Sequence, residues 1–125
     1  MSMSIESRKS SIKRAQKEAA LFRIVAQLLH QATIEEPLLS GLFMTRVVLS
    51  PGKTLCTAYV YTAQGATAFE AMLEQLKLFK PSMRKAIADT MQARYTVELV
   101  FRFDDTFEKA ERIERLLDQI KEEAS

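Results

Sequence analysis

The chain has little of what enzymes and metal proteins usually need. Its 125 residues include one cysteine, one histidine, three glycines and no tryptophan. A single cysteine excludes an intrachain disulfide and favours a reducing compartment, and the apolar strand-like segment around Cys56 is typical of a buried, inert thiol. One cysteine and one histidine cannot supply the ligands of a typical zinc site. We therefore expect no metal site and no cofactor.

Other absences narrow the function further. Three glycines provide no glycine-rich phosphate loop, and no apolar run approaches the length of a membrane span. The N-terminus lacks the apolar segment of an export signal. His30 stands apart from any acid or cysteine pattern, which favours a helix-surface residue over a catalyst. We predict a cytoplasmic protein that is not an enzyme, with no catalytic residues, no membrane partner and no small-molecule substrate.

What is present is the pattern of one modest α+β domain. Residues 1–10 are serine-rich and polar, and we expect a disordered N-terminal tail. Helical periodicity begins near Ser10 or Ser11 and ends before Pro37 and Gly41. Segments 42–50 and 54–62 have the residue pattern of β-strands and flank a turn, so they predict a β-hairpin.

The second half of the chain predicts two more helical regions and one strand. An apolar helical face begins near Phe69, and Pro81 is expected to break or sharply kink this helix, after which a second helix follows. A strand is predicted at 95–103. The order α-β-β-α-kink-α-β, with an additional C-terminal helix, predicts a three-stranded sheet with helices on one face. We expect the domain to span 11–105 and a C-terminal helix with an acidic tail to span 106–125.

Apolar spacing predicts which faces are buried. Strict alternation in the first strand places Phe43, Thr45, Val47 and Leu49 on one side. In the last helix, Ile113, Leu116, Leu117 and Ile120 form one stripe, and we expect this helix to dock because the stripe needs burial.

Charge is distributed unevenly along the chain. The net charge is only +2, but residues 77–102 hold six Lys/Arg against two acids, whereas residues 104–125 hold four against eight. Such asymmetry is typical of a polyanion binder, although charge alone favours the plainer explanation of solvated faces. Lys77, Lys80, Arg84 and Lys85 flank Pro81, where the N-terminus of a second helix would help to bind phosphate. A plain solvated helix surface remains the alternative.

Two adjacent carboxylates precede the last helix. Asp104 and Asp105 could bind a cation or cap the helix that follows them. Capping requires no further ligand, and it is the interpretation that we favour.

Several short motifs, in order, resemble the ribosome-binding factor A family. They cover roughly residues 14–120. The strongest are Met83-Arg84, then Arg94 with Glu98-Leu99-Val100-Phe101-Arg102-Phe103-Asp104-Asp105, then Arg112-Ile113 and Leu116-Leu117. Glu36-Pro37-Leu38-Leu39 and Ala58-Tyr59-Val60-Tyr61 resemble two further family motifs. Phe79-Lys80-Pro81 occupies the place of the family's Ala-x-Gly kink, so proline is expected to make the kink here.

The resemblance implies a type II KH-like fold and a non-catalytic assembly factor. Such factors bind the small (30S) ribosomal subunit, assist its late maturation and the 5′ processing of 16S rRNA, and support growth in the cold. By this resemblance we expect a monomer that binds RNA through a basic KH-like face. The expected RNA-binding residues are Lys13, Lys17, Lys77, Lys80, Arg84, Lys85 and Arg94, with the kink at Phe79, Lys80 and Pro81.

A second hypothesis is a small α/β protein-interaction module without RNA binding. A mixed sheet with two open edges would allow such a module to form a homodimer.

Overall fold

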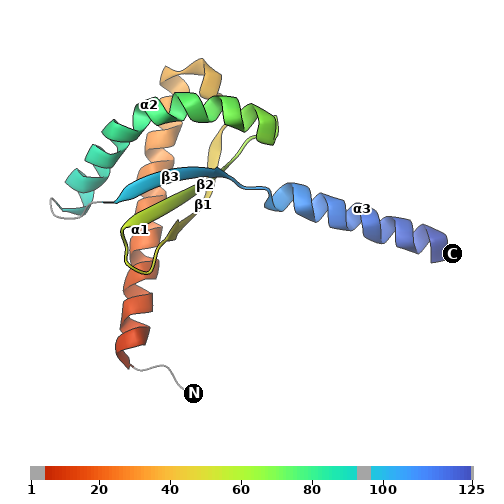
Figure 1. Ribbon diagram of the computed structural model, residues 1–125, viewed down its shortest axis with the longest axis horizontal. Coiled ribbons are helices and arrows are strands. Elements are labelled where there is room, and N and C mark those ends of the chain that lie inside the picture. The colour runs from red at the N-terminus through yellow and green to blue at the C-terminus, as the bar shows by residue number, and fades with distance from the viewer. Residues whose placement is uncertain (1–4, 93–96, 125) are drawn as a thin grey trace.

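The computed structural model describes residues 5–92 and 97–124. Within these ranges the chain forms a mixed α+β domain with a three-stranded sheet and three α-helices (Figure 1). The elements in chain order are α1 (Ile5–Glu35), η1 (Pro37–Leu39), β1 (Phe43–Leu49), β2 (Leu55–Tyr61), α2 (Ala66–Met91), β3 (Glu98–Phe103) and α3 (Thr106–Ala124).

Helix α1 begins earlier than the sequence predicted. It starts at Ile5, so residues 5–10 are helical and the disordered tail expected over 1–10 is wrong for this part. Adding turns to an existing helix costs little compared with nucleating one, so a polar segment without periodicity can extend it. Residues 1–4 lie outside the described part of the chain. The predicted C-terminal helix over 106–125 corresponds to α3.

The sheet has the order β1-β2-β3. Strands β1 and β2 pair antiparallel, as the predicted hairpin requires, and β2 and β3 pair parallel through the α2 crossover. Figure 1 shows α1 crossing behind the strands. The core lies between the sheet and these helices, and it includes Leu21 and Val25 of α1, Leu76 and Ile87 of α2, and Leu99 of β3.

A β-bulge in β1 changes which side chains are buried. Met44 pairs with Val60 and Arg46 pairs with Tyr59, so Thr45 is the extra residue between them. A bulge reverses the alternation on one side of itself. Met44 therefore joins Val47 and Leu49 in the core, and the expectation that Phe43 shares their side is wrong.

Pro81 does not end the helix that contains it. Helix α2 is continuous across Pro81, although Figure 1 shows its axis bending along its length. The prediction of two separate helices is therefore wrong. Proline removes one helical hydrogen bond, but buried residues on both sides, Leu76 before it and Met83 and Ile87 after it, hold the two halves together.

Helix α3 is not docked. Figure 1 shows it projecting away from the sheet, and none of its residues is buried. Its stripe is more than half exposed: Ile113 (58%), Leu116 (53%), Leu117 (53%) and Ile120 (60%). The expectation that this helix packs onto the domain is wrong for this chain on its own.

Candidate nucleic-acid interface

The second half of α2 presents a basic hollow. Arg84 and Lys85 line it together with Pro81, Ala88 and Val97, and its volume is about 330 Å³. The four helical residues recur at i, i+3, i+4 and i+7, which places them on one face of α2. Val97 closes the hollow from the segment before β3. Both cations are exposed, so an anion can reach them from solvent.

Burial on the opposite face of α2 keeps this basic face outward. Met83 and Ile87 are buried in the core, so the side chains on the other side of the helix point to solvent. Lys77 shares the outward face but is bonded to Glu74 at 3.1 Å. Lys80 is half-buried, at the edge of the face. Arg84 and Lys85 are therefore the two predicted residues that the structure brings together most clearly.

The backbone around Pro81 does not offer the helix end that the sequence suggested. Because α2 continues through Pro81, the backbone N–H groups that follow it belong to the helix interior. Phe79 is half-buried against the core and lines a hollow with Leu28 and Ala32 of α1, and Ser82 Oγ donates to the Phe79 carbonyl at 2.9 Å. The bend is thus an anchored structural feature, and any anion binding there relies on side chains.

The remaining predicted residues lie elsewhere. Lys13, which is exposed, and Lys17, which is half-buried, belong to the N-terminal half of α1. The bend of α2 contacts α1 from Leu28 onward, roughly 15 Å or more along the helix axis from Lys17. These two lysines and the α2 hollow are separate positive regions. Arg94 lies outside the described residues.

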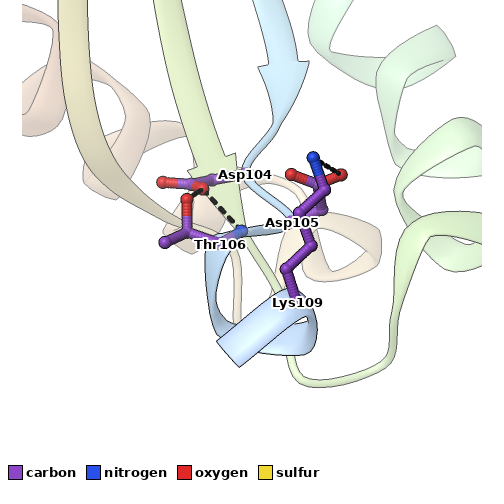
Figure 2. A network of polar contacts seen from close by, with 4 residues as sticks. All are labelled: Asp104, Asp105, Thr106 and Lys109. Carbon is purple, nitrogen blue, oxygen red and sulfur yellow. Dashed lines mark hydrogen bonds and ion pairs between the residues drawn. The ribbon is translucent and has the colours of Figure 1, made fainter. Parts of the chain in front are cut away.

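Asp104 caps α3, as the sequence favoured. Its carboxylate accepts the Thr106 N–H at 3.0 Å and the Thr106 hydroxyl, and Figure 2 shows this cluster beside the Asp105–Lys109 ion pair. Thr45, the bulge residue of β1, donates its hydroxyl to the second carboxylate oxygen at 2.5 Å. Hydrogen bonds from the Thr106 side chain, then from Thr45, then from the Thr106 backbone, with the nearby Arg46 charge, lower the pKa of Asp104 despite its burial. The carboxylate is occupied by protein donors.

The single thiol is inaccessible. Cys56 is fully buried in β2, and burial together with the negative charge of Glu18 raises its pKa to about 11. A neutral, enclosed thiol is a poor nucleophile and a poor metal ligand. Over residues 5–92 and 97–124, no group of three or more His, Cys, Asp or Glu side chains is arranged to hold a metal ion. None of the helices described there has both the length and the apolarity that a membrane crossing requires.

Sequence reasoning missed three side chains on the sheet. Arg46 of β1 lies over the ring of Tyr59 of β2, with its guanidinium carbon 4.0 Å from the ring centroid. Arg102 of β3 is the partner of Tyr59 on the other side. Strict alternation already places Arg46 on the side opposite Val47 and Leu49, but the row itself depends on the register of three strands. The signal that could have revealed it is the basic residue opposite an aromatic one across a hairpin.

Comparison with known proteins identifies the family. Residues 13–117 match the family model for ribosome-binding factor A. The chain belongs to the ribosome-binding factor A family. This span includes all of β1, β2, α2 and β3 and the greater part of α1 and α3.

Individual relatives agree with the assignment. The chain is 38% identical over 95 residues to ribosome-binding factor A of Rhodopseudomonas palustris (strain BisB18), covering 74% of this chain and 69% of the relative. It is 36% identical over 107 residues to ribosome-binding factor A of Methylobacterium sp. (strain 4-46), covering 83% of this chain and 76% of the relative. The crystal structure of ribosome-binding factor A from Thermus thermophilus has the same fold, with a TM-score of 0.61 at 24% identity over 72% of this chain and 93% of that one.

Proposed function

We propose that this protein is a cytoplasmic, non-catalytic factor that associates with free 30S ribosomal subunits. In this role it assists late subunit maturation and the 5′ processing of 16S rRNA, and it supports growth in the cold. Its partners are the small subunit and 16S rRNA, and it acts as a monomer.

Membership of a family named for ribosome binding is the observation that carries the proposal. The exposed pair Arg84 and Lys85 provides a physical means, since two cations above an open hollow suit a phosphate backbone. Binding of this kind releases counterions from RNA, so association with the subunit weakens as salt rises. The absence of a glycine loop at the bend matters little for a contact made by side chains to phosphates.

A charge-reversal pair tests the basic hollow. Arg84→Glu combined with Lys85→Glu is expected to weaken co-sedimentation with small subunits at least tenfold, because two phosphate contacts become repulsive. The matched control is Arg112→Glu with Arg115→Glu, which changes net charge equally on exposed positions of α3. Equal losses in both variants would indicate a general charge effect and remove Arg84 and Lys85 from the interface.

Protein association is the second candidate function. The observation in its favour is the exposed apolar stripe of α3, which other surfaces could cover. If the protein is a small interaction module that forms a homodimer, its self-association should not depend on salt, and it should not be retained on RNA. Sedimentation velocity over a concentration series separates the two: a single monomeric species that nevertheless binds small subunits excludes this candidate.

A further inference from the structure

The face of the sheet opposite the helices is open and carries aromatic and basic side chains. On the helical side, Cys56, Ala58 and Val60 of β2 are buried in the core. The intervening residues point the other way, where Tyr59 is half-buried. On neighbouring strands Phe43 is 51% exposed and Val48 is 42% exposed. Phe107, in the first turn of α3, contacts the end of this face at Tyr61, with 5.0 Å between ring centroids.

The centre of this face is a three-strand row of Arg46, Tyr59 and Arg102. The strand register makes Tyr59 the neighbour of both arginines, one on each side. Arg46 rests on the tyrosine ring at 4.0 Å, and both guanidinium groups belong to exposed residues. Stacking on an aromatic ring holds the planar guanidinium with its second face toward solvent. The row therefore offers a ligand the planar guanidinium of Arg46, with the positive charge of Arg102 on the neighbouring strand.

A second aromatic position lies next to this row. Tyr61 is two residues along β2 from Tyr59, roughly 6–7 Å away on the same face. Its ring is stacked on Phe103 at 5.7 Å between centroids, and it also contacts Phe43 at 5.6 Å and Phe107 at 5.0 Å. Phe43 and Phe107 are both about half exposed. The accessible ring surface at this second position is therefore that of Phe43 and Phe107, which are grouped around Tyr61.

Charges around the row favour an anionic ligand. No ion pair is recorded for Arg46 or Arg102 over residues 5–92 and 97–124. Asp104 is the acid whose charge is coupled to Arg46, but its carboxylate already accepts bonds from Thr45 and Thr106. Glu98, the other acid on this face, lies four residues from Arg102 at the far end of β3. The two arginines therefore retain donors for a phosphate.

We infer that this open sheet face is a second RNA-binding surface, which takes a single-stranded segment. One base stacks on the Arg46–Tyr59 pair, the next lies against the Tyr61 aromatic group, and Arg102 contacts the phosphate between them. Stacking of unpaired bases on aromatic rings and arginine planes is the usual way in which proteins bind single strands. The inference rests on the proposed function, since RNA is the ligand in both, but it uses a different surface from the α2 hollow.

The test measures binding of a fluorescein-labelled twelve-nucleotide oligouridylate by fluorescence anisotropy, with an RNA duplex of the same length for comparison. Tyr59→Leu, which removes the ring, is expected to weaken oligouridylate binding roughly tenfold. Tyr59→Phe keeps the ring and should bind as the unaltered protein does. Far-UV circular dichroism and thermal unfolding establish that both variants are folded.

Substitutions of Arg102 provide an independent test, through the salt dependence of binding. Arg102→Glu is expected to weaken binding and to reduce the slope of log Kd against log salt by about 0.7, the effect of one lost phosphate contact. Arg102→Lys should keep the slope, because it keeps the charge. A structural role for Arg102 would not produce this difference in salt dependence.

The outcomes separate this inference from the proposed function. Weaker oligouridylate binding in Tyr59→Leu, with unchanged duplex binding, supports the sheet surface. The inference is overturned if the protein does not bind oligouridylate, or if oligouridylate binding is lost only in the Arg84→Glu, Lys85→Glu variant. Association with small subunits can persist in either case, so the proposed function would still stand. Oligouridylate binding that survives Tyr59→Leu and Arg102→Glu together also overturns it, and would direct attention to a protein ligand for this face.

Discussion

The domain body and helix α3 carry similar apolar patterns but use them differently. In α2 the spaced apolar residues Met72, Leu76, Met83 and Ile87 are all buried. In α3 the equivalent stripe is exposed throughout, and no residue of the helix is buried. An apolar stripe thus predicts that a helix forms, but not that a surface within the same chain covers it.

Local interactions explain how α3 is held without a docking surface. Asp104 caps its first turn, and the ion pairs Asp105–Lys109 (3.3 Å) and Glu111–Arg115 (3.7 Å) link successive turns. Each exposed pair is worth only a few tenths of a kcal/mol. The body relies instead on a contiguous core, so the two regions should respond very differently to the same substitution.

The largest expected difference is between Leu99→Ala and Leu117→Ala. Leu99 is 2% exposed at the centre of the core, and its truncation should cost about 2–5 kcal/mol of unfolding free energy. Leu117 is 53% exposed, and the same change there should cost less than about 0.5 kcal/mol. Urea denaturation followed by circular dichroism measures both. A comparable loss at Leu117 would mean that α3 is covered in solution.

The junction between the two regions should show an intermediate effect. Asp104→Asn is expected to cost about 1 kcal/mol at neutral pH, because it weakens the charged hydrogen bonds to Thr45 and Thr106. The Asp105 side chain forms an ion pair with the exposed Lys109. Asp105→Asn should therefore cost less than about 0.5 kcal/mol of unfolding free energy. Urea denaturation of the two variants side by side measures the difference, and equal losses would contradict the capping role of Asp104.

The Asp104 effect should also depend on pH. Its pKa is lowered on folding, so the carboxylate contributes stability above its unfolded pKa of about 3.9 and loses that contribution as pH falls through the folded value. The stability difference between the unaltered protein and Asp104→Asn should therefore narrow in acid. A difference that stays constant from pH 7 to below about pH 3 would conflict with the assigned role of this carboxylate.

The smallest expected effect is that of removing α3. A chain that ends at Phe107 keeps the Asp104 cap and the contact between Phe107 and Tyr61. Its unfolding free energy should lie within about 0.5 kcal/mol of the full chain, because no buried surface is lost. Thermal unfolding by differential scanning calorimetry measures this. A marked loss of stability would show that residues beyond 107 pack on the body after all.

Much of the fold could be predicted from the sequence, because its determinants are local or periodic. The hairpin, the crossover helix and the parallel third strand follow from alternation, turn residues and the handedness of connections. The bulge at Thr45 could not be predicted from the strand itself, and the Thr45 hydroxyl donates to the buried Asp104, which lies 59 residues away in the sequence. The bulge decided both the burial of Met44 and the exposure of Phe43.

The candidate interface was predicted only in part, for a similar reason. The exposed pair Arg84 and Lys85 follows from helical spacing. The helix end expected at Pro81 is absent, because core packing of both halves of α2 outweighs the hydrogen bond that proline removes. The Arg46–Tyr59–Arg102 row needs the register of three strands, which no single segment contains.

Binding to the small ribosomal subunit is tested most directly by co-sedimentation of the purified protein with small subunits across a salt series. We expect retention on free small subunits to exceed retention on whole ribosomes and to fall steadily between about 50 and 200 mM salt, as phosphate contacts require. No retention even at the lowest salt, or retention that does not change with salt, would show that this chain does not bind the subunit through its basic surfaces.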